Sequence, residues 1–592
     1  MRPTALLVLL FAACSPSTRF DGFLGTDTDP EALPRYTPRW AFEPWISKDI
    51  STGPDTYAFV DGFRSRDIPV GVVVLDSPWE THYNTFVPNP SRYPDFPRLL
   101  ADLRERDVRV VLWTTQMVNQ TSFDLEAGGD QYVGPSPNYA EGKRNGFFVN
   151  DGKLYTWWKG QGAAVDFFNP GAVKWWRAQQ DELLSLGING WKLDFGEDYI
   201  TDQPLSTHAG TRTLQEYSEA YYRDFLTHGL KRRGKEEFLT MVRPYDKSYV
   251  FSGRFYAKKE HAPVAWVGDN RRDWVGLANA LDHIFRSARA GYVVVGSDIG
   301  GYLDIDDVDT SIRVPFSQAT FARWVAVGAM TPFMQLHGRG NLAPWTVPDR
   351  PDETVELYRY WAKLHHQLVP FFFSLAQSAY AGGAVPLAPV GDEAAWPGDY
   401  RFVLGESFLV APILDDSGVR DVPLPAGARW VDWWTGVAHD GGTTLPAVDS
   451  TDRRRIPLYV KEGALVPASV DDGSTALGTA ASKDRLTVLA FPGPVPTAFT
   501  VHHEDGGRVD LTALRDAQAL RVGLSRIPGA GAVLKVWNDG RMILSASNSA
   551  TLTKVPTRAD FDAAPAAFWN DGPYTWVRLP ASVDPVAVEL RH

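Results

Sequence analysis

The stretch GINGWKLDFGEDY, residues 187–199, carries a glycine-flanked apolar strand that runs directly into three acids, Asp194, Glu197 and Asp198. The preceding run DELLSLG, residues 181–187, is typical of a helix that ends at a glycine. The order of helix, tight turn, strand and acid is that of a (β/α)8 barrel, whose active site lies at the C-terminal ends of its strands. An acidic loop that solvates the end of a buried strand is the alternative, because structural and catalytic carboxylates look alike in sequence.

The same alternation of helix and strand repeats on both sides of this stretch. Helical patterns cover residues 57–66, 97–106 and 172–186, and apolar runs between them indicate strands. Counted from residue 70, the predicted strands are residues 70–75, 108–114, 163–168, 187–194, 238–243, 265–268, 291–296 and 330–336. Eight is the number of strands in a TIM barrel, so we predict an α/β protein built on a (β/α)8 barrel.

Each predicted strand carries a notable side chain where it leaves the sheet. In chain order these residues are Asp76, Trp113, Asp166, Asp194, Arg243, Asp269, Asp298 and His337. Any one of them could be a cap or a turn residue, yet chance placement at every exit is hard to sustain. Asp166 is the weakest member, because it precedes an Asn-Pro turn and is more readily a capping carboxylate.

Composition and charge restrict the class of partner. The chain has 592 residues, of which 44% are hydrophobic and 22% charged, as in globular proteins with a large core. Its net charge is −12 and it has no long basic run, which excludes the electrostatic footprint of a nucleic-acid-binding protein. The 21 tryptophans favour sugar binding slightly, because flat rings stack on pyranose faces, although they are equally ordinary core residues.

The N-terminus resembles a bacterial lipoprotein signal. Met1 and Arg2 form a basic start, residues 5–12 are apolar, and small residues lead into Cys14, the single cysteine of the sequence. The apolar run is too short for a membrane span, which needs about 20 residues. The resemblance implies cleavage before Cys14, lipidation of its thiol, and a protein held at the periplasmic or outer side of the bacterial cell envelope by its lipid alone. A plain secretory signal is the alternative, since Phe11 stands where leucine is usual.

We divide the chain into five segments. Residues 1–14 are the signal, 15–54 a tether and irregular lead-in, 55–380 the catalytic barrel, 381–475 a proximal β-sandwich and 476–592 a distal β-rich domain. A long aromatic helix over residues 353–380 is expected to end the barrel, and short strands with Pro/Gly turns follow it. The β-domains are expected to support the barrel rather than to carry chemistry.

Eight motifs along the chain are similar to those of glycoside hydrolase family 31. They are VVVLDSPW, VDFFNP, GWKLDFGED, WVGDN, GSDIGGY, TPFMQLHG, FVLGESFLVAPIL and RRRIPLYVKEGALVP, in the family's order, from about residue 57 to about residue 466. The resemblance implies a retaining exo-α-glycosidase on a (β/α)8 barrel with β-sandwich domains behind it. It also implies an oligosaccharide or glycoside as substrate and no cofactor.

Two aspartates match the family's catalytic pair. By motif, Asp194 in KLDFGE falls on the nucleophile and Asp269 in WVGD on the acid/base. A retaining glycosidase needs two carboxyls about 5–5.5 Å apart, one ionised and one protonated. Lys192 lies two residues before Asp194 on the same strand, so both side chains face the barrel interior, where the ammonium favours the ionised nucleophile.

Further strand-end residues are expected to bind one terminal sugar. The carboxylates accept hydrogen bonds from hydroxyl groups and the tryptophans form walls, and the set comprises Asp76, Trp113, Lys192, Trp266, Asp298 and His337. Two residues match the family's arginine after the fifth strand: Arg243 suits the strand and Arg254 suits the distance to the acid/base, so both are kept. Trp157 and Trp158, in a glycine-rich loop, either bind the ligand or cover the barrel mouth.

No metal site is expected. Residues 304–309 are acidic but lack the glycine and the later glutamate of a calcium loop. The pair His365-His366 lies in a predicted helix without the HExxH pattern of a zinc site. Both are therefore interpreted as ordinary polar structure.

The sugar stays open at this stage. The sequence DFGE around Asp194 resembles α-xylosidases and sulfoquinovosidases more than the DMNE of many α-glucosidases. The family usually carries a β-sandwich before the barrel, and about forty residues stand in its place here. We expect α-xylosidase or α-glucosidase activity first, with α-galactosidase, sulfoquinovosidase, α-transglycosylase and a non-catalytic glycan-binding lipoprotein as the alternatives.

Overall fold

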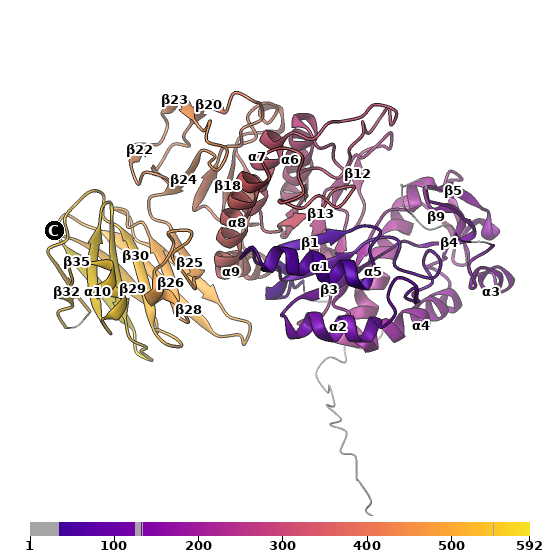
Figure 1. Ribbon diagram of the computed structural model, residues 1–592, viewed down its shortest axis with the longest axis horizontal. Helices are drawn as coiled ribbons and strands as arrows, with labels where there is room; N and C mark the ends of the chain where they lie inside the picture. The colour runs from indigo at the N-terminus through magenta and orange to yellow at the C-terminus, as the bar shows by residue number, and fades with distance from the viewer. Residues whose placement is uncertain (1–34, 125–131, 133, 549) are drawn as a thin grey trace, which may run out of the picture. The chain divides into compact units, whose positions relative to one another are not determined.

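A computed structural model describes residues 35–124, 132, 134–548 and 550–592 (Figure 1). The signal predicted for residues 1–14 and the lipidation of Cys14 lie outside the described residues. Within the described ranges, no helix is both long and apolar enough to cross a membrane.

The first domain is built on a closed parallel β-sheet. Hydrogen bonds join its strands in the order β14-β13-β10-β7-β3-β2-β1-β16-β15. The strands are β1 (Trp45–Lys48), β2 (Val72–Leu75), β3 (Arg109–Thr114), β7 (Gly190–Leu193), β10 (Leu239–Val242), β13 (Val264–Trp266), β14 (Val295–Gly296), β15 (Asp298–Ile299) and β16 (Gln335–Leu336). Ser297 alone separates β14 from β15, so these are two halves of one strand and the sheet closes on eight strand positions. The predicted (β/α)8 barrel is confirmed.

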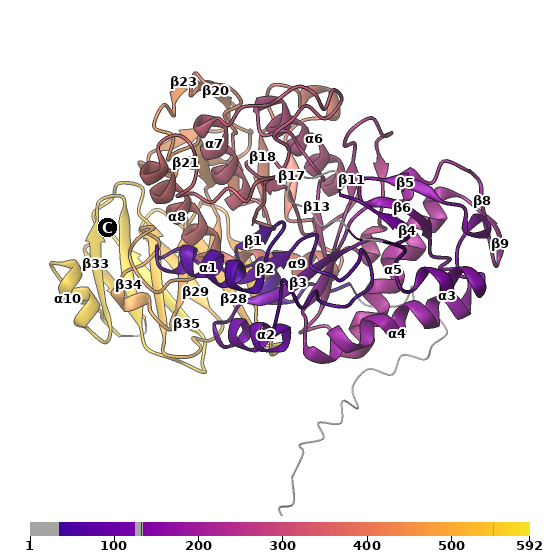
Figure 2. The ribbon, with the colours of Figure 1, turned by 45° about the vertical axis from the view of Figure 1, so that its right-hand side comes forward.

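Helices follow the strands along the chain and cover the outside of the barrel. They are α1 (Gly53–Arg64), α2 (Phe96–Glu105), α4 (Pro170–Leu186), α5 (Leu214–Arg233), α6 (Trp274–Arg289), α7 (Gln318–Ala329) and α8 (Pro351–Gln367). In both views α1 and α2 lie beside β1, β2 and β3 (Figure 1 and Figure 2). Because side chains fill the barrel on one face and helices cover the other, a strand such as β2, Val-Val-Val-Leu, is buried at every position.

The first barrel strand is β1, which the sequence reading placed in an irregular lead-in over residues 15–54. β1 is parallel to both β2 and β16, with Trp45 opposite Val72 and Gln335. Its four residues, WISK, follow a proline and lack the continuous β-branched run that marks β2. The pattern that predicted the other strands was therefore too short to predict this one.

Residues 163–168 are not a barrel strand, contrary to the prediction. They overlap β6, which is antiparallel to its two neighbours in a separate sheet inserted between β3 and β7. We call this sheet, made of β4 (Met117–Ser122), β5 (Tyr155–Trp157) and β6 (Gly160–Ala164), the insertion sheet. The apolar residues 163–165 are buried within it, which is why they imitate a barrel strand in sequence.

Asp166 consequently does not lie at a barrel exit. Its carboxylate accepts hydrogen bonds from the backbone N–H groups of Phe168, at 2.9 Å, and His208, at 2.6 Å. Such bonds stabilise a turn, so the capping interpretation of this aspartate is the one that the structure supports.

The turn between α4 and β7 places the central acidic stretch. The side chain of Asn169 caps α4 by accepting a hydrogen bond from the N–H of Gly171 at 2.9 Å. Gly187 ends the helix in the left-handed conformation, with φ +98°, as predicted. This left-handed backbone conformation is what requires glycine, because the nearest atom to an added Cβ is the end of the flexible Arg104 side chain, which can move away.

The helix predicted over residues 353–380 is divided into two. α8 ends at Gln367 and α9 (Val369–Tyr380) begins after Leu368. Pro370 lies in the first turn of α9, where a proline is tolerated, but it cannot donate the hydrogen bond that would continue α8 through this point.

Two β-rich regions follow the barrel. The proximal region contains a sheet of β17 (Leu387–Pro389), β18 (Phe402–Leu404), β19 (Phe408–Val410), β24 (Leu458–Lys461), β21 (Arg429–Asp432) and β22 (Ala438–Asp440), and a pair formed by β20 (Val419–Pro423) and β23 (Thr444–Asp449). The distal region has one sheet of β25 (Leu465–Ser469), β26 (Leu486–Ala490), β30 (Ala532–Trp537), β34 (Tyr574–Leu579), β33 (Ala567–Asp571) and β32 (Thr553–Lys554). Its second sheet contains β27 (Thr497–His502), β28 (Arg508–Arg515), β29 (Ala519–Leu524), β35 (Val586–Arg591) and β31 (Ser545–Ser547). The two distal sheets share one apolar core, as in a sandwich.

Candidate active site

The C-terminal ends of the barrel strands bring the predicted site residues together. β2 is followed by Asp76, β7 by Asp194, β10 by Arg243 and β16 by His337, while β3 contains Trp113, β15 contains Asp298 and the loop after β13 contains Asp269. Hydrogen bonds described below link them into two connected groups. One group surrounds the carboxylates of Asp194 and Asp269, and the other surrounds the imidazole of His337.

Asp194 is held as an anion. The indole N–H of Trp113 donates to its Oδ2 at 3.0 Å, and Arg243 Nε and the N–H of Phe195 donate to its Oδ1, both at 2.9 Å. Burial alone raises the pKa of this carboxyl, but the charges of Arg243 and Lys192, together with these hydrogen bonds, hold the pKa below its usual value. Asp194 is therefore ionised at neutral pH, as a nucleophile must be.

The pKa of Asp269 is shifted in the opposite direction to that of Asp194. Its Oδ1 accepts a hydrogen bond from Arg243 Nη2 and its Oδ2 one from the hydroxyl of Tyr249, each at 3.1 Å. Burial raises the pKa of Asp269 to about 6; the charge of Asp194 adds to the rise and that of Arg243 opposes it. This carboxyl thus holds its proton to a higher pH than Asp194 does, which suits a general acid.

Arg243 joins the two carboxyls. Its side chain is fully buried, and Nη2 lies 2.8 Å from Asp194 Oδ1 and 3.1 Å from Asp269 Oδ1. The two oxygens that share this nitrogen lie within about 6 Å of each other, a spacing compatible with a retaining pair. Asp246 also binds the guanidinium, and the rings of Phe195 and Trp266 lie 4.2 and 4.9 Å from its central carbon.

The second group is a chain of ion pairs. Lys192 Nζ lies 2.7 Å from Asp76 Oδ2, 3.4 Å from His337 Nδ1, and 5.1 Å from the ring centre of Trp266. His337 contacts Asp298 through Nδ1 at 3.1 Å. All these polar side chains are buried, so they are shielded from solvent and are paired with one another.

Asp49 completes this group and was not predicted. It follows β1, is 4% exposed, and its Oδ1 lies 2.8 Å from His337 Nε2. Burial and the Lys192 charge lower the pKa of His337, but Asp49 and Asp298 outweigh them and raise it to about 10. The imidazole is therefore a cation at neutral pH. The signal in the sequence was an acid directly after the short segment WISK, and it becomes visible once β1 is recognised as a strand.

The structure separates the two candidate arginines. Arg254 Nη2 lies 3.2 Å from Glu197 and 3.0 Å from Asp198, in contrast to Arg243, which contacts both Asp194 and Asp269. Its guanidinium stacks on Tyr256. Arg254 therefore neutralises the two acids of the short helix behind the site, and we place it in a supporting position.

The insertion sheet supplies an aromatic wall. Trp158 is half-buried, and its ring centre lies 6.4 Å from that of Trp113 and 5.6 Å from that of Phe195. Trp157 is 1% exposed and donates its indole hydrogen bond to Asn119 at 2.7 Å. Of the two predicted tryptophans, Trp158 is the one placed to contact a ligand, and Trp157 is structural.

Asp49, Asp76 and His337 also resemble a metal site, since one ligand atom from each lies within 4.8 Å of the others. A cation of the protein is already in contact with this cluster, because Lys192 binds Asp76 and approaches His337. The ammonium supplies the positive charge that three such groups require, and we assign no metal to them.

Two family models cover most of the chain. Residues 34–375 match the glycosyl hydrolases family 31 TIM-barrel domain, and residues 383–466 match the glycosyl hydrolase family 31 C-terminal domain. Among relatives, the chain is 25% identical over 462 residues to an alpha-xylosidase of Emericella nidulans, covering 74% of this chain and 54% of that protein. It is also 25% identical over 511 residues to Alpha-glucosidase 2 of Bacillus thermoamyloliquefaciens, covering 81% and 60%. The chain thus spans little more than half the length of these curated relatives.

Solved structures share the fold at lower identity. A cycloalternan-forming enzyme from Listeria monocytogenes, in complex with a pentasaccharide substrate, superimposes with a TM-score of 0.80 at 20% identity, covering 94% of this chain and 54% of that one. A Flavobacterium johnsoniae family 31 dextranase complexed with glucose gives 0.77 at 20% identity, covering 94% and 71%. With the closed barrel, its strand-end aspartates and the match over residues 34–375, this chain belongs to glycosyl hydrolase family 31.

Proposed function

We propose that this protein is an exo-acting retaining α-glycosidase that hydrolyses a terminal α-linked sugar from an oligosaccharide or glycoside. The observation that carries the proposal is that Asp194 and Asp269 share the guanidinium of Arg243 while their pKa values shift in opposite directions. One carboxylate ready to attack and one carboxyl ready to donate a proton are what double displacement requires.

In the first step Asp194 attacks the anomeric carbon. Its Oδ1 accepts hydrogen bonds from Arg243 and the N–H of Phe195, whereas Oδ2 accepts one from Trp113, so Oδ2 is the less stabilised oxygen and the better nucleophile. Asp269 gives its proton to the glycosidic oxygen as the bond from that oxygen to the anomeric carbon breaks. The leaving group departs as an alcohol, and the sugar is held as an ester of Asp194.

In the second step a water molecule replaces the leaving group. Asp269, now ionised, takes a proton from the water as its oxygen attacks the anomeric carbon and the ester bond to Asp194 breaks. The sugar leaves with its α configuration retained. A sugar hydroxyl that takes the place of water would give transglycosylation with the same residues, so product analysis with added acceptor sugar separates the two outcomes.

The ion-paired group is the proposed binding site for the terminal sugar. The carboxylates of Asp49, Asp76 and Asp298 each have lone pairs beyond those used in the protein, and these accept hydrogen bonds from sugar hydroxyls. Trp266 and Trp158 contribute apolar walls. We assign one sugar unit at the end of a chain to this cluster, as exo action requires.

For the sugar itself, we propose xylose or glucose. The names of the two relatives described above support this order, and the DFGE context of Asp194 is compatible with it. Galactose and sulfoquinovose are the alternatives.

A panel of aryl α-glycosides tests the proposal. The protein lacking residues 1–14 is incubated with aryl α-glycosides of xylose, glucose, galactose, N-acetylgalactosamine and sulfoquinovose, next to its Asp194→Ala variant. We expect release from at least one glycoside by the wild type and a loss of at least about 10³-fold in the variant, because removal of a nucleophile leaves only binding and electrostatic effects.

Asp166→Asn is the matched control, because the sequence pattern placed this aspartate at a strand exit and the structure places it in a turn. Its activity should equal that of the wild type. Undiminished activity of Asp194→Ala would refute the nucleophile. Glycan binding without any release would favour a non-catalytic glycan-binding protein.

We also propose that the protein is held at the bacterial cell envelope by a lipid on Cys14. The basic start, the short apolar run and the small residues before Cys14 support this proposal. Metabolic labelling with a fatty acid should label the full chain and not its Cys14→Ser variant. Equal labelling of the two would refute lipidation at this residue.

A further inference from the structure

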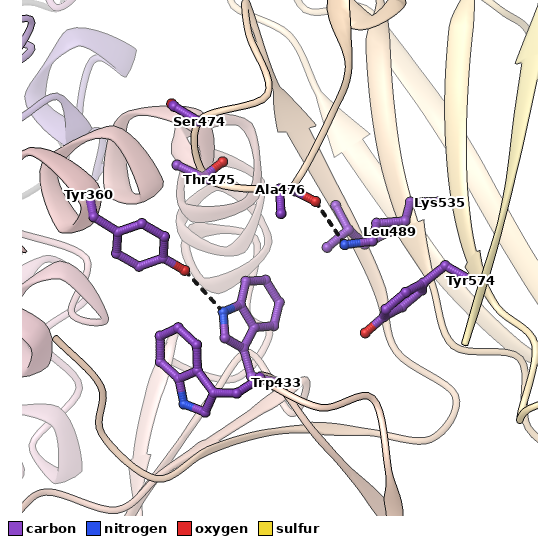
Figure 3. A pocket seen from close by; sticks show the side chains of 9 residues that line it. Tyr360, Trp433, Ser474, Thr475, Ala476, Leu489, Lys535 and Tyr574 are labelled. Atoms are coloured by element: carbon purple, nitrogen blue, oxygen red, sulfur yellow. Dashed lines mark hydrogen bonds between the residues drawn. The ribbon is translucent and has the colours of Figure 1, made fainter. Parts of the chain in front are cut away.

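A cavity of about 220 Å³ lies where α8 meets the two β-rich regions (Figure 3). Its lining shares no residue with the candidate active site. The residues come from α8, from the segment after β21, from the loop after β25 and from three strands of the distal sheet: Tyr360, Trp433, Trp434, Ser474, Thr475, Ala476, Leu489, Lys535 and Tyr574.

Four of the nine lining residues are aromatic. Figure 3 shows Tyr360 reaching the cavity from a helix and Tyr574 from a strand, with Trp433 drawn between them. Trp433 donates its indole N–H to the hydroxyl of Tyr360 at 3.4 Å, and Trp434 donates to the backbone oxygen of Ile456 at 2.8 Å. These bonds fix the rings in place, and flat fixed rings are surfaces on which the apolar faces of pyranoses stack.

Lys535 brings a positive charge to this aromatic cavity. Its Nζ donates one hydrogen bond, to the backbone oxygen of Ala476 at 2.8 Å, and lies 4.2 Å from the ring centre of Tyr574 and 5.3 Å from that of Trp576. An ammonium has three donors, so two are left for a ligand. Within the described part of the chain, no carboxylate oxygen lies within 4.0 Å of this nitrogen. Burial lowers the pKa of Lys535 to about 8, and the exposed Asp571 counteracts this only from a distance.

We propose that this cavity binds one pyranose unit that carries a carboxylate, such as a hexuronic acid residue of an acidic glycan. The ring of Trp433 would stack on the sugar, and Lys535, which lies over the ring of Tyr574, would bind the carboxylate with the donors that Ala476 does not use. At about 220 Å³ the cavity is smaller than the roughly 300–1,000 Å³ that encloses drug-sized ligands, so a single sugar unit is the largest ligand of this class that fits.

The site goes beyond the proposed hydrolysis, because it contains neither Asp194 nor Asp269. It would hold an acidic glycan on the β-rich side of the protein while the barrel cleaves terminal sugars. The two roles can be tested separately, since substitution of Lys535 touches none of the residues placed in the candidate active site.

Isothermal titration calorimetry at pH 6.5 tests the proposal with methyl α-D-glucuronide and methyl α-D-galacturonide as probes and methyl α-D-glucoside as the neutral comparison. We expect the protein to bind at least one uronide about tenfold or more tightly than the neutral glycoside, because a charged hydrogen-bonded pair is added. Lys535→Met should lower the uronide affinity about tenfold, and Lys535→Arg should retain it.

Lys483→Met is the matched control, because Lys483 is an exposed lysine of the same region outside the cavity lining. It should bind the uronide as the wild type does, and thermal melting should show all variants folded. Absence of uronide binding in the wild type, equal affinity for the neutral glycoside, or unchanged binding by Lys535→Met would each overturn the proposal. Retained aryl glycosidase activity in Lys535→Met would show that such a failure concerns this cavity and not the barrel.

Discussion

At the scale of single residues, neighbours rather than exposure distinguish the two central carboxyls. Both are largely buried, and burial raises the pKa of each. Asp194 accepts three close donors from Trp113, Arg243 and the N–H of Phe195, which reverses the effect, whereas Asp269 shares one guanidinium nitrogen and a neutral tyrosine hydroxyl. The environment thus divides the roles of nucleophile and acid between two side chains of the same type.

The acid assigned to Asp269 predicts a pH dependence. Because the first step needs this carboxyl protonated, kcat/KM should fall as pH rises through about 6, the pKa to which burial raises it. Asp269→Ala should lose about 10²–10⁴-fold on glycosides with poor leaving groups and much less on those whose leaving group needs no proton. A pH profile of kcat/KM tests the first expectation, and kinetics on a series of leaving groups test the second. An equal loss across the series would contradict the role of Asp269 as the acid.

Asp49 provides a second prediction at this scale. Asp49→Asn removes the charge that pairs with Nε2 of His337, so the pKa of His337 should fall from about 10 toward its usual value. Nitrogen-15 NMR of the imidazoles would measure the shift, and KM should rise about tenfold because one charged acceptor for a sugar hydroxyl is lost.

The matched control for Asp49 is Asp181→Asn. Asp181 Oδ1, on α4, lies 2.9 Å from Nε2 of His228, on α5, and neither residue belongs to the two groups of the candidate site, so its loss should alter the titration of His228 and leave His337 unchanged. An unaltered His337 titration in Asp49→Asn would show that Asp49 does not hold the imidazolium.

At the scale of elements, the insertion sheet places two adjacent tryptophans in different roles. Trp158→Ala should raise KM about tenfold with little change in melting temperature, because the half-buried ring lines the mouth. Trp157→Ala should instead lower the free energy of unfolding by about 3–5 kcal/mol, because it empties a buried ring position. Steady-state kinetics and chemical denaturation distinguish the two. A large stability loss in Trp158→Ala would contradict its assignment as a ligand wall.

The apolar pattern of the barrel strands also explains where prediction from the sequence succeeded. A barrel strand that is buried on both faces appears in the sequence as a short apolar run, and a polar residue at its end stands out against that run. This pattern identified Asp76, Asp194 and His337. The same pattern failed at β1, whose four residues are too few to show it, and at β6, whose apolar residues are buried in a different sheet. The predicted count of eight strands was therefore correct although one member was wrong and one was missing.

At the scale of the whole molecule, the features that sequence could not reveal are those made by distant segments. Arg243 and Arg254 both suited the family motif, and only the folded chain shows which of them reaches both Asp194 and Asp269. The cavity at Lys535 gathers residues between positions 360 and 574, and no local pattern relates them. Packing of the β-rich regions against α8 creates that cavity.

The most direct test of the central claim is to trap the sugar on the enzyme. The protein is incubated with a 5-fluoro α-glycosyl fluoride of the sugar that the aryl glycoside panel identifies, because slow hydrolysis of the ester lets a retaining intermediate accumulate. Mass spectrometry of the intact protein and of its peptides should find one added glycosyl group, on Asp194, and none in Asp194→Ala. Turnover of that sugar's aryl glycoside with the label on another residue, or with no covalent label at all, would contradict double displacement through Asp194.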